Sequence, residues 1–266
     1  MNKTGSESAI ALPPVNSDTI SACEERAFRA WPAEGVLRQA GWSIRHDTRS
    51  TTRRTRSVLA GHLDETINVD VLLEQTEAFY GNLGLPARFQ ITPASCPNDL
   101  DARLDDRGYL TEAPTVVEWA ICHEIDDPGV PSFDIRVMDD ASDDWLDTYR
   151  CGLAGDLDLN GRRAILKRIR QPKALVGLWI GGVVASIGLG VFDSGWLGIF
   201  CMFTREEYRA KGYAYQVLGA LCRWNLDQGG EYLYLQVEED NPAARSLYEK
   251  YGFIHAYDYH YRTLSH

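Results

Sequence analysis

The chain has 266 residues, a hydrophobic fraction of 44% and a formal net charge of −11. This composition supplies enough apolar material for a packed core and excludes a largely disordered chain, and no apolar run approaches the ~18 residues of a membrane-spanning helix. The acidic balance weighs against nucleic-acid binding, because contacts with phosphate dominate such affinity.

The N-terminal end and the cysteines suggest a compartment. Residues 1–19 lack the charged start and apolar centre of a secretory signal, so we expect a flexible tail. The six cysteines are scattered without a CxxC pair, which is typical of reduced thiols in the cytoplasm. None of the six histidines has HxxxH spacing, so we expect no metal site.

The first half of the chain predicts a domain over residues 20–122 in which short strands alternate with helices. Strands are expected at 41–46, 54–61, 87–92 and 115–122, and helices at 67–83 and within 98–109. Residues 45–56 carry five arginines. We interpret them as an edge strand and hairpin with solvated or ion-paired arginines, although a nucleic-acid patch stays open.

An acidic segment with two prolines, 123–132, is the predicted linker to a second domain over 133–266. This half predicts an α/β arrangement, with alternating and apolar runs for strands and a 3.6-residue periodicity for helices. We expect strands at 133–138, 173–182, 183–192, 196–204, 231–238 and 253–264, and helices at 141–154, 158–170, 212–227 and 241–252. A strand-helix-glycine-aromatic unit ending at Gly108 recurs at Gly252 and suggests two copies of one fold.

The stretch RAKGYA, residues 209–214, separates the predicted strand 196–204 from the predicted helix 212–227. Backbone N–H groups at a helix start have no intrahelical partner, and the helix dipole adds positive potential there. Together with Arg209 and Lys211, such a turn suits a pyrophosphate. The spacing matches neither GxxxxGK[ST] nor GxGxxG, and alone it is equally typical of an ordinary basic helix start.

A second motif follows in the right order. RAKGYA fits Q/R-x-x-G-x-G/A, and residues 241–253, NPAARSLYEKYGF, fit N-x-x-A-x-x-L/F-Y-x-x-x-G-F. With both motifs, the chain resembles the GCN5-related N-acetyltransferase (GNAT) superfamily, strongly over 133–262 and modestly over 20–122. The resemblance implies a tandem GNAT fold of class α/β (α+β), with a mixed central sheet flanked by helices, splayed strands at the acetyl-CoA site and a degenerate N-terminal half.

The resemblance also implies roles for particular residues. The pyrophosphate of acetyl-CoA would lie on the backbone of Arg209, Ala210, Lys211, Gly212, Tyr213 and Ala214. The pantetheine arm would bond to the strand at Met202, Phe203 and Thr204, with Asn241 nearby. The Tyr248 hydroxyl would lie near the thioester sulfur and protonate the departing thiolate, although a core tyrosine is the alternative.

The general base is open, because the strand residues 196–203 contain no carboxylate. Glu238 and Asp193 are candidates, as is a water relay, and for Glu238 a solvent-exposed strand end is the favoured interpretation. Cys201 lies within an apolar strand and is expected to be a small core residue. At the position equivalent to Tyr248 the first half has Leu104, so we expect one active site per chain.

The expected activity is transfer of an acetyl group from acetyl-CoA to a primary amine of a small molecule or amino acid. Acetylation of protein N-termini or lysines is an alternative, as is a non-catalytic acyl-CoA sensor. The expected partners are acetyl-CoA and the amine, without metal, nucleic acid or membrane, and a homodimer is compatible with the sequence. The net charge of −11 favours a cationic acceptor through long-range steering.

Overall fold

The computed structural model describes residues 10–264 except 65, 126–132 and 154–155. In this part of the chain, eleven strands form one mixed sheet in the order β1-β2-β3-β4-β11-β5-β10-β9-β8-β7-β6. The strands are β1 (Gly35–Gln39), β2 (Trp42–His46), β3 (Val58–Ala60), β4 (Ala87–Ile91), β5 (Leu110–Ile121), β6 (Asp134–Met138), β7 (Lys173–Ile180), β8 (Val183–Asp193), β9 (Trp196–Thr204), β10 (Tyr232–Glu238) and β11 (Ile254–Leu264).

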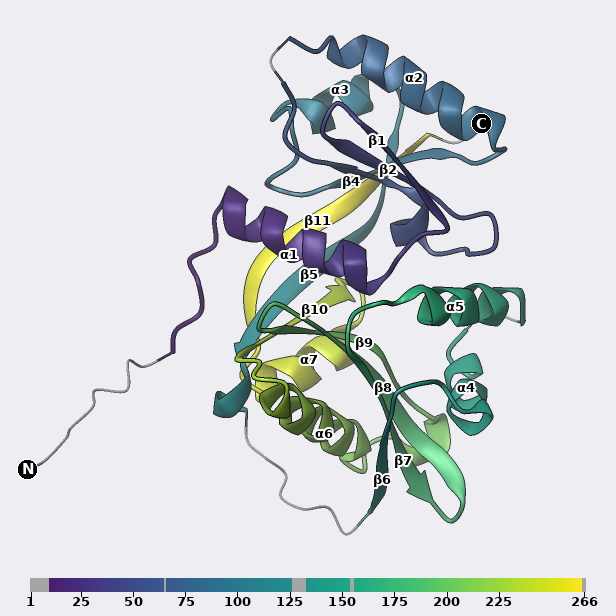
Figure 1. The fold of residues 1–266 in the computed structure, drawn as a ribbon, viewed down its shortest axis with the longest axis vertical. Helices are drawn as coiled ribbons and strands as arrows, with labels where there is room; N and C mark the ends of the chain where they lie inside the picture. Colours follow the sequence, from purple (N-terminus) through teal and green to yellow (C-terminus); the bar gives the residue numbers. More distant parts are fainter. Residues whose placement is uncertain (1–9, 65, 126–132, 154–155, 265–266) are drawn as a thin grey trace, which may run out of the picture.

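Helices cover the sheet on both faces (Figure 1). They are α1 (Ser17–Ala30), α2 (Val69–Asn82), α3 (Leu100–Asp106), α4 (Asp143–Arg150), α5 (Asp156–Arg168), α6 (Tyr213–Asp227) and α7 (Pro242–Lys250), with 3₁₀ turns η1 (Arg53–Arg56), η2 (Cys122–Glu124) and η3 (Glu206–Tyr208). The apolar sides of α6 and α7 pack on one face of β5, β8, β9 and β10. Helix α1 packs on the other face, with Ile20, Cys23 and Ala27 against Trp119 and Trp196.

The two halves of the chain exchange their last strands. Strand β5, from the first half, pairs antiparallel with β10 from Tyr232–Ile121 to Glu238–Thr115. Strand β11, from the second half, lies between β5 and β4 and pairs antiparallel with both. Each half therefore completes the sheet of the other, although the division into domains at 123–132 stays a prediction and residues 126–132 lie outside the described part.

Most elements lie within a few residues of the sequence prediction, and the repeated unit is present as β4-α3-β5 and β10-α7-β11. Gly108 and Gly252 end the two helices with φ of 83° and 77°. One prediction is wrong: residues 54–61 are not one strand, because Arg53–Arg56 form the turn η1 and only Val58–Ala60 pair with their neighbours.

Two elements were not expected from the sequence, strand β1 and helix α1. Helix α1 begins at Ser17, within the stretch predicted as a tail, and Asn16 and Thr19 cap it reciprocally through side chain and backbone. This capping box was a readable signal. Residues 1–9 lie outside the described part of the chain. Among the helices that the structure describes, none has both the length and the apolar character to cross a bilayer.

Candidate active site

The parallel strands β9 and β10 separate at one end. They pair from Trp196–Tyr232 to Ile199–Leu235 and no further, although β9 continues to Thr204 and β10 to Glu238. On its other edge β9 stays paired with β8, through a bulge that places two residues, Cys201 and Met202, opposite one residue of β8. Such a bulge bends a strand and re-aims its backbone. The expected splayed strands are therefore present.

The φ of 53° at Cys201 shows how the bulge is built. A non-glycine residue in this left-handed region is strained and persists where the surroundings impose it. Cys201 is half-buried: it packs against a core cluster, as expected from the sequence, and it also lines the cavity between the strands. Burial raises the pKa of its thiol to about 11, which keeps the thiol protonated and a poor nucleophile.

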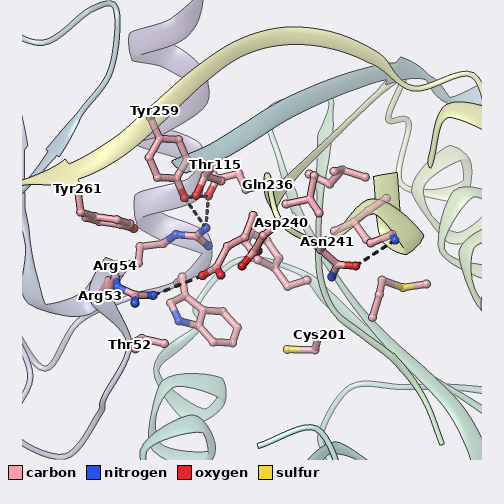
Figure 2. Close-up of a pocket in the computed structure, with 18 of the residues that line it drawn as sticks. Thr52, Arg53, Arg54, Thr115, Cys201, Gln236, Asp240, Asn241, Tyr259 and Tyr261 are labelled. Carbon is pink, nitrogen blue, oxygen red and sulfur yellow. Dashed lines mark hydrogen bonds and ion pairs between the residues drawn. The ribbon is translucent and has the colours of Figure 1, made fainter. Parts of the chain in front are cut away.

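A cavity of about 690 Å³ fills the space between the separated strands (Figure 2). Residues of β9, β10 and α7 form one wall, and residues from the first half of the chain form the other. The first wall comprises Ile199, Phe200, Cys201, Met202, Leu235, Gln236, Val237, Glu238, Asp240, Asn241, Ala244 and Tyr248. The second wall includes Thr51, Thr52, Arg53, Arg54, Arg88, Glu112 and Thr115, joined by Tyr259 and Tyr261 of the exchanged strand β11. The N-terminal half thus contributes directly to the cavity.

The structure brings together four of the residues named from the sequence. Met202, Glu238, Asn241 and Tyr248 all line the cavity. Phe203 and Thr204 continue β9 beyond it, and residues 209–214 form the turn into α6. Asp193 does not line the cavity, because it lies where β9 begins, at the opposite end from the separation, and its Oδ2 accepts from Arg29 Nε at 2.6 Å.

Tyr248 lies in the second turn of α7 and is 7% exposed. Its ring meets the ring of Phe253 edge to face, with centroids 5.6 Å apart. Burial, and then the negative charge of Glu118, raise the pKa of Tyr248. The hydroxyl is therefore protonated at neutral pH, the state that a proton donor requires. The core and acid interpretations are compatible in this geometry, because the ring packs in the core and the residue lines the cavity.

Two other groups of the first wall are polar. The Oδ1 of Asn241 accepts from Ala244 N at 3.1 Å and caps α7, which leaves the amide N–H groups for the cavity. The Glu238 carboxylate, with a side chain that is 54% exposed, lies 3.4 Å from Arg53 Nη1. Arg53 also lies 3.4 Å from Glu112 Oε2. The carboxylates of both walls therefore meet at one arginine of the first half.

The turn into α6 has the properties of an anion site. Gly212 precedes the helix with φ of 78° and no side-chain cap, and Ala210 has φ of 58°. A Cβ added at Gly212 would meet nothing within 4 Å, so the space in front of the helix is open. Lys211 Nζ donates to the carbonyl of Glu207 at 2.9 Å, and Arg209 Nε donates to the carbonyl of Thr204 at 3.3 Å. Residues 209–214 thus offer free first-turn N–H groups beside two positive charges.

The arginine-rich segment is not a simple solvated hairpin. Arg45 is 1% exposed and donates to the Ser57 carbonyl at 2.8 Å, while Arg53 and Arg54 line the cavity. The sequence interpretation missed these roles, and it also missed Arg162 and Asp240. The run of arginines was a signal, but the sequence does not say which of them point inward.

Among the described residues, no group of three or more His, Cys, Asp or Glu side chains is arranged to hold a metal. The six cysteines are all free. The side chains that line the cavity supply hydroxyl, carboxylate, guanidinium and thiol groups.

Comparison with known proteins places this geometry in a family. The model of the family described as "Probable histone acetyltransferase Rv0428c C-terminal" matches residues 17–262. The chain is 29% identical to the "Uncharacterized N-acetyltransferase YobR" of Bacillus subtilis over 249 residues, which cover 92% of this chain and 98% of that protein.

Solved structures share the fold over nearly the whole length. A GCN5-related N-acetyltransferase from Kribbella flavida superposes with a TM-score of 0.68 at 14% identity, covering 95% of this chain and 96% of that one. A tandem GNAT protein from the clavulanic acid biosynthesis pathway gives 0.66 at 12% identity, covering 96% and 89%. With the family match over residues 17–262, the chain belongs to the Rv0428c C-terminal acetyltransferase family and is an acyltransferase, and it has the tandem fold of the GCN5-related N-acetyltransferase structures.

Proposed function

We propose that the chain transfers the acetyl group of acetyl-CoA to a primary amine of a small molecule, at a single site between β9 and β10. The observation that carries the proposal is the separation of β9 from β10 beside the uncapped start of α6. A helix start without a capping side chain suits the pyrophosphate. The free edge of β9 at Met202–Thr204 suits the amides of the pantetheine arm.

In the proposed reaction, the lone pair of the neutral amine attacks the thioester carbonyl, and a C–N bond forms. A backbone N–H at the bulge of β9 stabilises the oxyanion. When the C–S bond breaks, the electron pair goes to sulfur, which takes a proton from Tyr248. The nitrogen loses its proton to Glu238, directly or through water. Arg53 Nη1 lies 3.4 Å from Glu238 Oε1 and holds this carboxylate at the wall of the cavity.

The size of the cavity favours a small acceptor. A volume of about 690 Å³ lies within the range of small-molecule sites, and the end of the pantetheine arm would occupy part of it. Protein N-terminal or lysine acetylation is the second candidate, because the family description names a histone acetyltransferase. A non-catalytic acyl-CoA sensor is the third. A cytoplasmic location with reduced thiols and no nucleic-acid partner is part of the same proposal.

An acceptor screen that follows thiol release from acetyl-CoA separates these functions. The proposal expects release that depends on a small amine and an acetylated amine of the corresponding mass. Modification of histone peptides but not of free amines would favour the protein acetyltransferase. Binding of acetyl-CoA without turnover, for any amine or peptide, would favour the sensor. Glu238→Gln should lower turnover without weakening acetyl-CoA binding, with the neighbouring Asp240→Asn as its comparison.

A further inference from the structure

The charged side chains of the cavity do not cancel. Four arginines and three carboxylates line it, in a chain whose net charge is −11. Two of the arginines are matched with carboxylates: Arg53 with Glu112 and Glu238 at 3.4 Å each, and Arg88 with Glu112 at 3.6 Å. Of the other two, Arg162 has one long ion pair, with Asp158 at 3.7 Å, which does not line the cavity, and Arg54 has none among the described residues.

Arg54 has neutral partners. Its Nη2 donates to Gln236 Oε1 and, at 3.4 Å, to the hydroxyl of Tyr259, while its Nε is buried without a hydrogen-bond partner (Figure 2). Among the described residues it forms no ion pair within 4.0 Å. The buried carboxylate of Glu24 acts on Arg54 through its charge and forms no ion pair with it, and Glu24 Oε1 accepts from Gln236 Nε2 at 3.4 Å. A guanidinium fork in such a place has donors to spare.

Arg162, on α5, shares one property with Arg54, a buried Nε without a hydrogen-bond partner. Its Nε lies 3.7 Å from Asp158 Oδ1, beyond hydrogen-bond distance, and is buried without a hydrogen-bond partner. Its side chain is 21% exposed, and it lines the cavity from the second half of the chain.

The two guanidinium groups lie over one pair of stacked rings. Trp31 and Phe200 stack with centroids 5.6 Å apart and planes 19° from parallel. Arg54 lies 5.6 Å from the Phe200 centroid, and Arg162 lies 5.6 Å from the Trp31 centroid. Both positive charges also act on the thiol of Cys201, against the effect of burial on its pKa. The two arginines thus face the bulge of β9, beside which the thioester would lie.

We infer that the acceptor is an amine that also carries a carboxylate, as a free amino acid does, and that Arg54 and Arg162 bind this carboxylate. A guanidinium fork binds a carboxylate through paired, charge-assisted hydrogen bonds. An amine without an anionic group would leave Arg54 with neutral partners alone and both Nε donors without a hydrogen bond in a partly desolvated cavity, which is costly. The local charge of the cavity therefore opposes the purely cationic acceptor that the net charge suggests.

This inference rests on the proposed function and makes it more specific. The test compares acceptors that share one carbon skeleton: L-amino acids, their primary amides, and the corresponding aminophosphonic acids. The quantities measured are kcat and KM for thiol release with saturating acetyl-CoA. We expect kcat/KM for the best amino acid to exceed that of its amide roughly 10- to 100-fold, the value of one hydrogen-bonded charged contact.

The variant Arg162→Gln identifies the residue responsible. It should raise KM for the amino acid roughly 10- to 100-fold, change kcat little, and leave KM for the amide unchanged. Arg162→Lys, which keeps the charge, should recover part of the loss. Arg163→Gln is the matched control, because Arg163 lies next on α5, is 45% exposed, pairs with Asp143 at 3.1 Å and does not line the cavity.

Each outcome has a definite meaning. Unchanged acetyl-CoA affinity shows that a variant is folded. Amines that are acetylated without preference for the carboxylate overturn the inference and leave the proposed function standing. A preference for the phosphonic acid overturns the carboxylate in favour of a phosphate-bearing amine. If acetyl-CoA binds and no amine turns over, the proposed function fails, and this inference fails with it.

Discussion

Each half of the molecule has a pair of parallel strands, β3 with β4 and β9 with β10, and a helix follows the first strand of each pair. The starts of these two helices differ. In the first half α2 follows β3, and Asn68 caps it by accepting from Asp70 N at 3.0 Å and Val71 N at 3.3 Å. In the second half α6 follows β9 behind Gly212, with no side-chain cap. The first helix start is filled by an amide oxygen and an acidic residue, whereas the second is open.

This difference supports the proposed acetyl-CoA site in the second half rather than in the first. An incoming phosphate at α2 would compete with Asn68 for the same N–H groups and meet the negative charge of Asp70, which lies in the first turn. At α6 it would meet free N–H groups. The contrast continues in α3, where Leu104 is fully buried at the position equivalent to Tyr248. The first half nevertheless contributes, since it supplies arginines to the shared cavity and exchanges β5 for β11.

The largest expected effect comes from filling the open helix start. Gly212→Glu introduces a negative charge beside the pyrophosphate, and a close like charge costs several kcal/mol. We expect the Kd for acetyl-CoA, measured by calorimetry, to rise about 100-fold or more. Gly229→Glu is the control, because Gly229 follows the other end of α6 with φ of 77° and equally open space. Both variants place glutamate at a positive φ, so equal losses of affinity would contradict the assignment.

Removal of the proposed acid is next in size. Tyr248→Phe should lower kcat by about 10²-fold, at the lower end of general acid catalysis because water can replace the hydroxyl, and leave the Kd for acetyl-CoA unchanged. Because the pKa of Tyr248 is raised, the wild-type rate should not fall with rising pH below about 10, where tyrosine ordinarily ionises.

Tyr251→Phe is the control for that experiment. Tyr251 follows α7, stacks on Tyr215 with centroids 4.2 Å apart, and does not line the cavity. Its variant should keep the wild-type kcat. A wild-type kcat in the Tyr248 variant as well would leave the core interpretation as the whole role of that side chain.

The accuracy of the sequence predictions differed between the halves for physical reasons. In the second half the elements are bounded by residues with strong local preferences, such as Asn241 and Pro242 at the start of α7 and Gly252 after its end. In the first half the segment 54–61 alternates like a strand, but tertiary contacts of Arg54 with Gln236 and Tyr259 hold its start in a turn.

The pairing of distant strands was less accessible from the sequence. Periodicity shows that β5 and β11 are strands, but it does not show which strands they pair with. A strand of either half would offer each of them an apolar neighbour. The arginines of the cavity share this limit. Arg54 and Arg162 lie far apart in the sequence, and only the folded chain brings both to the rings of Phe200 and Trp31.

The next prediction compares two capping residues, one in each half, and expects smaller effects on stability and on binding. Asn68→Ala and Asn241→Ala each remove a capping side chain, and each should lower the free energy of unfolding by about 1 kcal/mol. Only Asn241 lines the cavity, so only its variant should weaken acetyl-CoA binding, by about 2- to 10-fold for one lost hydrogen bond. Urea unfolding and calorimetry measure the two quantities. Weaker binding in the Asn68 variant would show that both halves take part in holding acetyl-CoA.

The smallest expected effect is on the pH dependence of the free energy of unfolding. It tests whether α7 covers the exchanged strand β5. Glu118 lies on β5, so it belongs to the first half, yet it is 7% exposed beneath α7 of the second half, with Oε2 unpartnered. Burial raises the pKa of this carboxyl, and the negative charge of Glu249 raises it further. Interactions with Arg245 and His255 lower the pKa and offset part of this rise. Above the unfolded pKa of about 4.3, the folded chain retains this proton more strongly than the unfolded chain, so stability is lost as the pH rises through the folded pKa.

Glu118→Gln removes that loss. The variant should be as stable as the wild type near pH 4 and become more stable than the wild type as the pH rises towards 8. The difference in the free energy of unfolding should not exceed the roughly 1 kcal/mol of a helix cap. Urea unfolding at a series of pH values measures the difference. Glu231→Gln, at an exposed carboxylate before β10, should show no such trend. A flat difference for Glu118→Gln as well would mean that the carboxylate reaches water. In that case α7 would not seal the exchanged strand, and the two halves would be less tightly joined than their shared sheet indicates.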